Sequence, residues 1–307
     1  MLNKKITTQD NNQTTNSYGQ NQDVVLVSLV VCTRNRAHFL HSHLASITAI
    51  TSTVLWEIIF VDNNSSDETP KILAEFANLS SVPVSIVHEK IPGLSKARNA
   101  GWRQSNAKII AFTDDDCYPD PDFINKVAEA FLEKNISFTG GRVLLHDPND
   151  LPTTIKLSDE FDYINPYSFI WPGTIHGANF AFTKKLLEDV GGFDPLMGAG
   201  TPFPCEDCDI LLRASNNGMR GKYCPNIVVS HHHRRRTPED LAKLDKAYLE
   251  GRGAYFMKAL VDLQKPGRTA RMWYYSAKMW GLNAFVKEVY SGINYLLARK
   301  KATKMEP

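Results

Sequence analysis

The sequence predicts an α/β fold with a Rossmann-like, mostly parallel central sheet that is flanked by helices. The first observation is a set of short apolar runs without polar alternation, which is typical of strands buried on both faces. The second is that segments with a helical pattern separate these runs, as a parallel sheet requires. The third is that polar clusters follow several runs directly, and open α/β sheets bind ligands at the carboxyl ends of strands.

The first half of the chain alternates strand and helix. Strands are expected at residues 24–32, 55–61, 84–87 and 108–112. Helices are expected at about 37–50, 66–76, 95–105 and 122–134. Polar loops of only a few residues join most of these elements, which favours a single sheet covered on both faces.

The second half has a different character. Strands are expected at 137–145, 177–182 and 222–230, and helices from 184 onward and at 206–217. Residues 146–176 are rich in Pro, Asp and Tyr and are expected to form a long, partly irregular loop. We therefore predict a disordered tail at 1–22, a main domain at 23–236 with halves at 23–120 and 121–236, and a helical extension at 237–307.

Composition excludes several classes of protein. The 307 residues are 43% hydrophobic and 22% charged, which is ordinary for a globular protein. The net charge of +2 gives no reason to expect a nucleic-acid partner. We expect neither a signal peptide nor a transmembrane helix, because no suitable apolar stretch occurs. Five cysteines, an odd and small number, favour a reducing cytoplasm.

The most informative motif is a cluster of three carboxylates, Asp114, Asp115 and Asp116, directly after an apolar run. Like charges at a strand end repel one another unless a positive group joins them. A hard divalent cation with oxygen ligands, Mg²⁺ or Mn²⁺, would serve. The alternative is a solvated acidic turn before Pro119, since charged turns are common.

Further polar residues stand at the ends of other predicted strands and in two predicted helices. They are Thr33, Arg34, Asn35 and Arg36 after the first strand, Asp62 and Asn64 after the second, Arg98 in the third helix, Glu206 and Asp207 at a helix start, and His231 after the last strand. This order, with Gly93 to Gly101 around Arg98, resembles the family 2 glycosyltransferases, which have the GT-A fold, over about residues 24–233.

The resemblance implies roles for these residues. Those that would bind the nucleotide-sugar are Thr33, Arg34, Asn35, Arg36, Asp62, Asn64, Arg98, Asp114 and Asp115. Asp116 would bind the metal, with Asp114 and His231 completing its ligand shell. Asp207 would be the general base, with Glu206 as its neighbour. Gly177, Ala178, Asn179 and Trp171 would lie on the acceptor side. On this basis 23–120 is the nucleotide-sugar half and 121–236 the acceptor half.

The implied reaction is metal-dependent, inverting transfer of a sugar from a nucleotide diphosphate, UDP being the commonest, to a saccharide or lipid-linked acceptor in polysaccharide or glycoconjugate synthesis. Elementary chemistry agrees, because a cation can stabilise the diphosphate and a carboxylate can take the proton of the attacking hydroxyl. Attack from the side opposite the leaving group inverts the stereochemistry. A sugar nucleotidyltransferase, or an inactive nucleotide-sugar-binding protein on the same fold, remains the alternative.

Two ambiguities stay open in the sequence. Cys205, Cys208, Cys224 and His231 have a spacing that can bind structural zinc, although the two carboxylates between the cysteines already have a role. His233 would share a face with His231 on a strand, so that either could be the metal ligand, and we favour His231.

The segment after Arg271 mixes aromatic and basic residues, and the pattern favours helices packed on the main domain. The alternative is peripheral attachment to an anionic membrane, where a lipid-linked acceptor would be found. We therefore expect a cytoplasmic protein, or one attached peripherally to the inner face of a membrane.

Overall fold

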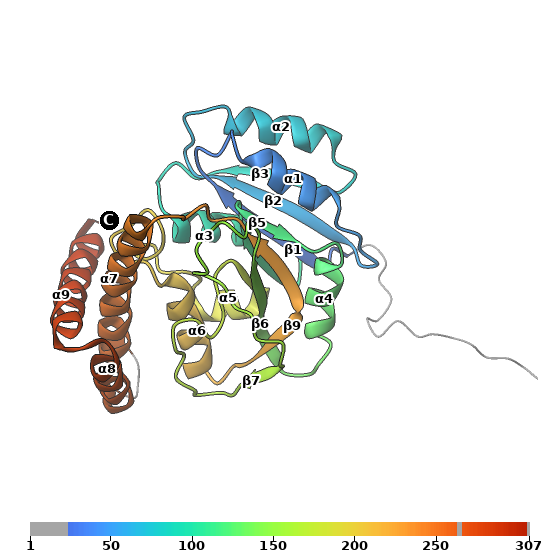
Figure 1. The fold of residues 1–307 in the computed structure, drawn as a ribbon. Helices are drawn as coiled ribbons and strands as arrows, with labels where there is room; N and C mark the ends of the chain where they lie inside the picture. The colour runs from blue at the N-terminus through green and yellow to red at the C-terminus, as the bar shows by residue number, and fades with distance from the viewer. Residues whose placement is uncertain (1–23, 263–265, 306–307) are drawn as a thin grey trace, which may run out of the picture.

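A nine-stranded mixed sheet forms the centre of the part of the chain that the computed structural model describes, residues 24–262 and 266–305 (Figure 1). The tail expected at 1–22 lies outside the described residues. The strands are β1 (Val27–Thr33), β2 (Trp56–Asp62), β3 (Val84–His88), β4 (Ile109–Asp114), β5 (Cys117–Pro119), β6 (Ile136–Leu145), β7 (Asp162–Ile164), β8 (Asn179–Thr183) and β9 (Arg220–His231). The helices are α1 (Leu40–Thr48), α2 (Thr69–Leu79), α3 (Leu94–Gln104), α4 (Phe123–Ala130), α5 (Lys184–Val190), α6 (Glu206–Asn216), α7 (Pro238–Asp262), α8 (Pro266–Trp280) and α9 (Leu282–Met305).

The strand order is β3-β2-β1-β4-β8-β6-β9-β5, and β7 pairs with β9. Strands β1 to β4 are parallel to one another, as the alternation of strand and helix predicted. Strand β8 runs antiparallel to both β4 and β6, so the second half of the sheet is mixed. The halves expected at 23–120 and 121–236 thus share one sheet through the β4–β8 pair, and the boundary between them stays a prediction.

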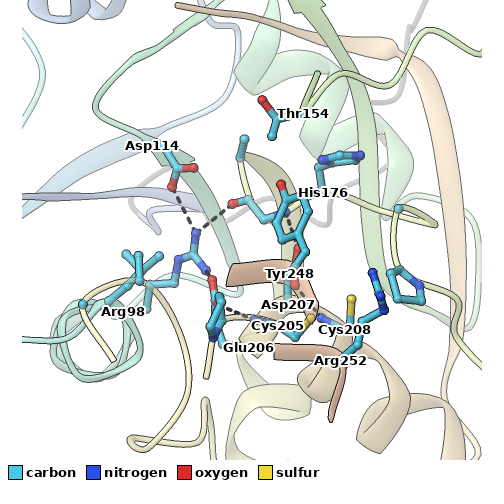
Figure 2. A pocket seen from close by; sticks show the side chains of 18 of the residues that line it. Arg98, Asp114, Thr154, His176, Cys205, Glu206, Asp207, Cys208, Tyr248 and Arg252 are labelled. Atoms are coloured by element: carbon cyan, nitrogen blue, oxygen red, sulfur yellow. Dashed lines mark hydrogen bonds and ion pairs between the residues drawn. The ribbon is translucent and has the colours of Figure 1, made fainter. Parts of the chain in front are cut away.

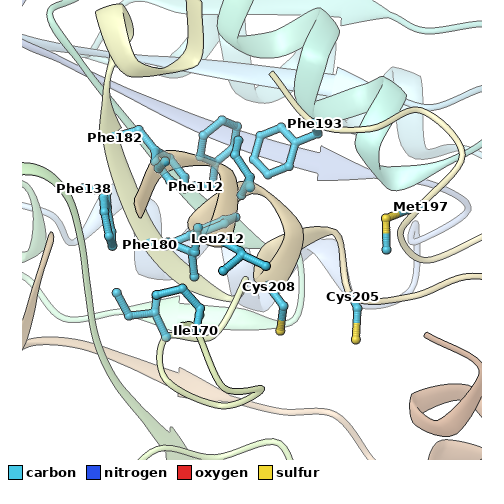
Figure 3. Close-up of a cluster of buried hydrophobic side chains, with 14 of the residues drawn as sticks. Phe112, Phe138, Ile170, Phe180, Phe182, Phe193, Met197, Cys205, Cys208 and Leu212 are labelled. Carbon is cyan, nitrogen blue, oxygen red and sulfur yellow. The ribbon is translucent and has the colours of Figure 1, made fainter. Parts of the chain in front are cut away.

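Both faces of the sheet are buried, which explains the apolar runs without alternation. Successive side chains of a strand point to opposite faces. In β4, Ile110 and Phe112 join a core on one face, while Ile109 and Ala111 join a second core on the other. Helices α1, α2 and α4 contribute to the second core, and α3, α5, α6 and α7 to the first. Figure 3 shows the aromatic centre of the first core, where Phe112, Phe180, Phe182 and Phe193 pack edge to face.

The strand register brings the polar ends of the first strands together. Thr33 pairs with Asp62 across β1 and β2, and Cys32 pairs with Asp114 across β1 and β4. Because β8 is antiparallel to β4, its first residue, Asn179, pairs with Thr113 beside the acidic cluster. Short strands β5 and β7 were not expected, since three residues are too few to show a periodicity.

The C-terminal segment forms α7, α8 and α9, which lie together at one side of the molecule (Figure 1). Two glycines of α7 permit close packing. A side chain on Gly253 would meet the backbone oxygen of Glu288 in α9 at 2.1 Å, and one on Gly251 would meet that of Pro204 at 1.7 Å. Within the described ranges, no helix has the length and apolar character needed to cross a membrane.

Candidate active site

A cavity of about 890 Å³ opens at the carboxyl ends of β1 and β4. Many of the predicted site residues line it: Thr33, Arg34, Arg36, Arg98, Asp114, Asp115, Asp116, Trp171, Gly177, Ala178, Glu206, Asp207 and His231. They come from six segments that are far apart in the sequence. Their convergence follows from the register of the strands, because each polar cluster stands at the same edge of the sheet.

Arg36 holds two of the three aspartates. Its Nε lies 3.1 Å from Asp115 Oδ1, and its Nη2 lies 3.2 Å from Asp116 Oδ2. Burial raises the pKa of Asp115 to about 7, although Arg36 opposes that rise. Burial also acts to raise the pKa of Asp116, but His231 and Arg36 outweigh it and lower that pKa to about 2. Asp116 therefore stays ionised at neutral pH.

His231 faces Asp116 in a geometry that suits a metal ion. Its Nε2 lies 3.4 Å from Asp116 Oδ1, and its Nδ1 donates to the carbonyl oxygen of Thr154 at 3.2 Å. A carbonyl that fixes the proton on Nδ1 directs Nε2 toward a metal, as is usual for histidine ligands. The Cys117 sulfur lies within 4.8 Å of both ligand atoms, but burial raises its pKa well above the ordinary value, so the thiol keeps its proton. A carboxylate and an imidazole are donors that Mn²⁺ accepts.

His233 does not share this position. Its Nε2 donates to the carbonyl oxygen of Leu151 at 3.0 Å, and its Nδ1 accepts from the Arg235 backbone N–H at 3.0 Å. Both nitrogens are thus occupied, which favours His231 as the ligand.

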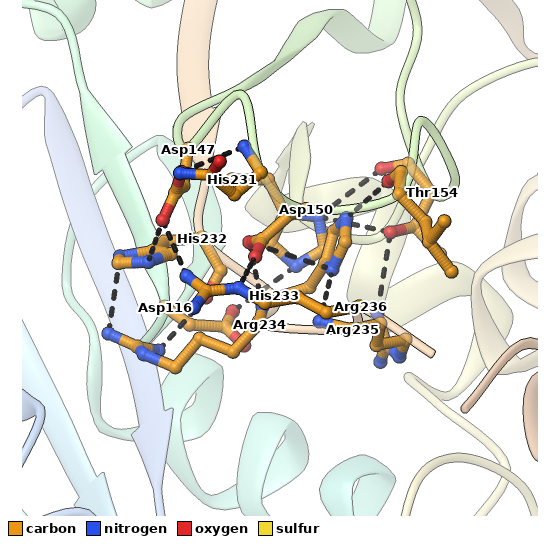
Figure 4. A network of polar contacts seen from close by, with 12 residues as sticks. Asp116, Asp147, Asp150, Thr154, His231, His232, His233, Arg234, Arg235 and Arg236 are labelled. Carbon is orange, nitrogen blue, oxygen red and sulfur yellow. Dashed lines mark hydrogen bonds and ion pairs between the residues drawn. The ribbon is translucent and has the colours of Figure 1, made fainter. Parts of the chain in front are cut away.

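The three consecutive arginines after these histidines make different contacts (Figure 4). Arg234 stacks on Phe39, with its guanidinium carbon 4.1 Å from the ring centroid. Arg236 pairs with Asp150 at 2.9 Å and with Asp147. Arg235 instead lines the cavity, where its Nη1 reaches Thr154 Oγ1 only at 3.5 Å. Of these three arginines, Arg235 is therefore the one that lines the cavity.

Arg98 connects the acidic cluster to helix α6 (Figure 2). The side chain is 2% exposed and donates to Glu206 Oε1 at 2.7 Å, to Asp114 Oδ1 at 3.0 Å and to the Gly177 carbonyl at 2.9 Å. Burial raises the pKa of Glu206 above its ordinary value, although Arg98 acts against that rise. Arg98 is thus fully engaged by the protein, which makes it a group that positions the carboxylates.

Asp207 stands at the first turn of α6, where its Oδ2 accepts from the Gly177 N–H at 3.1 Å and its Oδ1 from the Cys208 N–H at 2.8 Å. Cys205, which caps α6, has φ 117°, a strained value for a residue with a side chain. Backbone strain of this kind clusters at functional sites. The structure gives Asp207 two anchoring hydrogen bonds and leaves it on the cavity wall.

Four of the predicted residues lie outside the cavity lining. Asn35 and Asn64 adopt left-handed φ values of 54° and 61° in exposed loops. Asp62 is buried beneath that edge and accepts from the Ser65 N–H at 3.1 Å. The amide of Asn179 donates to two carbonyl oxygens inside the sheet, at 2.8 and 3.0 Å. In these positions the four residues contribute to the structure of the loops and the sheet. That they also bind a ligand stays a prediction.

Other lining residues were not anticipated from the sequence. They are Asn63, Thr154, His176, Asp245, Tyr248 and Arg252. Asn63 directly follows Asp62, so the strand end was the signal that could have found it. His176 precedes Gly177, and its burial lowers its pKa although Asp207 lies near, which keeps the imidazole neutral. The residues of α7 carry no signal, because nothing in a helical pattern indicates which cavity a face will line.

The cysteines do not assemble the zinc site considered above. Cys205 and Cys208 belong to the core on one face of the sheet, and Cys224 belongs to the core on the other. In residues 24–262 and 266–305, the one cluster with metal-ligand geometry is Asp116, Cys117 and His231.

Comparison with known proteins finds relatives that are named glycosyltransferases. AglE, a glycosyltransferase of Haloferax volcanii, is 27% identical over 207 residues, which cover 67% of this chain and 66% of AglE. The Escherichia coli UDP-Glc:alpha-D-GlcNAc-diphosphoundecaprenol beta-1,3-glucosyltransferase WfgD is 27% identical over 54% of this chain and 72% of its own. Other curated relatives are longer, and the match spans 47% of a pre-mycofactocin glycosyltransferase of Mycobacterium tuberculosis.

Solved structures share the fold. The Pyrobaculum calidifontis mannosyltransferase PcManGT, in complex with GDP-Man and Mn²⁺, superposes with a TM-score of 0.58 at 16% identity over 91% of both chains. S. aureus TarS in complex with UDP-GlcNAc gives 0.57 at 15% identity, covering 80% of this chain and 69% of TarS. A family model described as Glycosyl transferase family 2 matches residues 28–191, which is more than half of the sequence. The chain therefore belongs to glycosyl transferase family 2, with a GT-A fold.

Proposed function

We propose that this protein is a metal-dependent, inverting glycosyltransferase that moves a sugar from a nucleotide-diphosphate donor, UDP-linked in our expectation, to a saccharide or lipid-linked acceptor. The observation that carries the proposal is the joint placement of Asp116, His231 and Asp207 around one cavity at the carboxyl edge of the sheet. The family supports the reaction class, and the named relatives act on sugars.

The donor side would hold the nucleotide and its diphosphate. Asp116 and His231 would hold a divalent cation, and that cation supplies Lewis-acid stabilisation of the diphosphate charge. Arg235 faces the same space and would add positive charge near the leaving group. The Mn²⁺ and GDP-Man in the PcManGT structure support this use of the site, while the choice between Mn²⁺ and Mg²⁺ belongs to the proposal.

Asp207 would act as the general base. A carboxylate oxygen takes the proton of the acceptor hydroxyl. At the same time the hydroxyl oxygen attacks the anomeric carbon, and the bond from that carbon to the diphosphate breaks. The hydrogen bonds from the Gly177 and Cys208 N–H groups fix the orientation of Asp207. Glu206 would be held away from this role, because Arg98 binds it at 2.7 Å. Attack opposite the leaving group gives inversion of configuration.

The product distinguishes this reaction from the alternatives. Incubation of UDP-glucose, UDP-GlcNAc, GDP-mannose or a dTDP-sugar with a methyl glycoside as the acceptor, and with Mn²⁺ or EDTA, should give a glycosylated product and a nucleoside diphosphate only in the presence of the metal. A sugar nucleotidyltransferase would instead release pyrophosphate from a nucleoside triphosphate and a sugar 1-phosphate, and an inactive binding protein would release neither. Proton NMR of the product should show an anomeric configuration opposite to that of the donor.

Peripheral membrane association forms part of the proposal. Helix α8, the turn after it and α9 expose large apolar side chains, among them Met279 at 72% and Leu282 at 74%. Lys278 and Lys287 stand on the same helices. Apolar side chains beside cations are the features that bind an anionic membrane surface. Such attachment would bring the cavity close to a lipid-linked acceptor.

A further inference from the structure

One wall of the cavity comes from the C-terminal helices, which the family match at 28–191 does not include. The lining residues of this wall are Asp245, Tyr248, Leu249, Arg252 and Phe256 of α7, Ser276, Met279 and Trp280 of α8, and Ala284 of α9. In the view of Figure 2, Asp207 lies between Asp114 on one side and Arg252 on the other. The wall adjoins the predicted base, because Tyr248 of α7 is close enough to feel the charge of Asp207.

Trp280 is the largest exposed side chain of this wall. The guanidinium carbon of Arg252 lies over its ring, 4.7 Å from the centroid, and 58% of the residue remains accessible. One face of the indole is thus backed by a cation. The ring lines the cavity, so its accessible surface is available to a ligand there.

The support behind Trp280 is rigid. Arg252 Nε donates to Glu288 Oε1 at 2.8 Å, and the indole N–H of Trp273 donates to Glu288 Oε2 at 2.8 Å. Glu288 belongs to α9 and is 1% exposed, and its two partners come from α7 and α8. A buried carboxylate whose oxygens are both bound fixes the geometry of the helices around it. The position of the Trp280 ring is therefore set by three helices at once.

Polar residues belong to the same wall. Asp245, Tyr248 and Ser276 are among the residues that line the cavity. Burial raises the pKa of Tyr248 far above its ordinary value, and the nearby Asp207 raises it further, so the hydroxyl keeps its proton and donates. A flat aromatic surface with a few polar groups around it is a pattern that holds a ligand with one apolar face and several hydroxyls.

We propose that Trp280 is the stacking platform of an acceptor subsite that takes a pyranose ring of a saccharide, with Arg252 as its positioning residue. The C–H groups on one face of a pyranose carry partial positive charge, which the negative face of an aromatic ring attracts. The hydroxyls of the sugar would meet the polar groups of α7 and α8. This inference rests on the proposed function and adds to it the chemical class and the place of the acceptor.

The test is saturation-transfer NMR on the full chain with four probes, the methyl glycosides of β-glucose, β-galactose, α-mannose and N-acetyl-β-glucosamine. UDP and Mg²⁺ are present in the same tube, because Mg²⁺ is diamagnetic and does not broaden the proton signals. At least one glycoside should receive saturation at the C–H protons of a single ring face. Trp280→Ala should weaken its binding by at least about fivefold, and Trp280→Phe should retain most of the binding, because a ring remains.

The matched control is Tyr290→Ala, which removes an aromatic ring of α9 that is 68% exposed and lies outside the cavity lining. It should leave the glycoside signal unchanged. Saturation of UDP in the same spectra reports on the proposed function separately. UDP binding without any glycoside signal, or a glycoside signal that survives Trp280→Ala, would overturn the subsite and leave the donor site standing. Absence of a UDP signal from the wild-type spectra would instead count against UDP as the donor.

Discussion

At the scale of single residues, the two carboxylates at the start of α6 have the same charge and opposite environments. Glu206 is bound by the buried guanidinium of Arg98, whereas Asp207 accepts from the backbone N–H groups of Gly177 and Cys208 and lines the cavity. The environment therefore assigns the structural role to one and leaves the other free to take a proton. Neighbouring acids in a sequence do not reveal this division, because it depends on a helix 108 residues earlier in the chain.

Asp207→Asn should lower kcat by about 10² to 10⁴ and leave donor binding unchanged, because an amide keeps the shape but cannot accept the proton. The measurement is steady-state release of nucleoside diphosphate, with donor affinity from calorimetry. Asp189→Asn, a change at a surface acid paired with Lys185, is the control and should have normal kinetics. Unchanged turnover in Asp207→Asn would show that another group is the base.

His43 gives a residue-scale prediction about pH. Burial lowers its pKa from 6.5 to about 4, although its hydrogen bond to the Cys117 carbonyl acts in the other direction. The folded state thus prefers the neutral imidazole. The stabilisation is fully present above pH 6.5 and is lost as the pH falls to about 4, by about 3 kcal/mol.

Urea unfolding of the wild type and of His43→Gln at pH 7.5, 6, 5 and 4 measures this difference. Glutamine does not titrate and can still donate to the carbonyl. The wild type should lose about 3 kcal/mol more than the variant over this range. Parallel stability curves for the two proteins would mean that His43 does not titrate as its burial implies.

At the scale of elements, the strands that the sequence predicted best are those buried on both faces. Strands β1, β2, β3 and β4 begin and end within three residues of the expected positions, because each is a continuous apolar run. The sequence motifs likewise predicted that the acidic cluster follows a strand and that Glu206 and Asp207 begin a helix. What the pattern could not give was pairing direction, since β8 looks the same whether it joins β4 parallel or antiparallel.

The role of the C-terminal helices was also beyond the sequence. The helical pattern predicted packing on the main domain, and buried residues of α7, α8 and α9 join its core. That Tyr248 and Trp280 would line the cavity depends on how closely α7 approaches Pro204, which a glycine at 251 permits. A close contact between distant segments leaves no periodic signal.

A buried ionic network connects these helices to α6. The Nζ of Lys258 in α7 lies 2.7 Å from Asp209 Oδ1 and 3.1 Å from Asp194 Oδ2. Asp209 also binds Arg213, and Asp194 accepts from the Tyr295 hydroxyl of α9 at 2.7 Å. Because Asp209 is two residues from the predicted base, this network ties the extension to the site.

Lys258→Met should cost about 3 kcal/mol of unfolding free energy, because it leaves buried carboxylates with one cation fewer. Urea denaturation measures the loss. Lys246→Met removes a lysine that is 78% exposed from the same helix and should change stability by no more than about 0.5 kcal/mol. Equal effects of the two substitutions would show that the buried network does not hold α7 in place.

At the scale of the whole molecule, the proposed donor side, the proposed base and the C-terminal helices surround one cavity, and the exposed apolar residues of α8 and α9 lie on the helices that line one of its walls. A ligand that enters past these helices meets the acceptor wall before the acidic cluster. The arrangement agrees with an acceptor presented from a membrane surface and a donor that comes from solution.

Membrane association predicts co-sedimentation with vesicles of phosphatidylglycerol and phosphatidylcholine, stronger at low salt because cations contribute. Leu282→Asp should weaken it, since it places a negative charge at the exposed start of α9, next to the turn after α8. Leu79→Asp alters a leucine that is 87% exposed at the end of α2 and should have no effect. Equal sedimentation of the wild type and Leu282→Asp would remove this turn from any membrane contact.

The central claim is a metal-dependent nucleotide site at the carboxyl edge of the sheet, and thermal unfolding with UDP, GDP, dTDP or CDP, each with and without Mn²⁺, tests it most directly. At 100 times its Kd, a ligand adds about 2.7 kcal/mol to the stability of the folded state. We predict a rise in Tm with one nucleotide only when Mn²⁺ is present, its loss in Asp116→Asn, and its retention in Asp120→Asn outside the cavity lining. A rise that is independent of Mn²⁺, or that persists in Asp116→Asn, would contradict the claim.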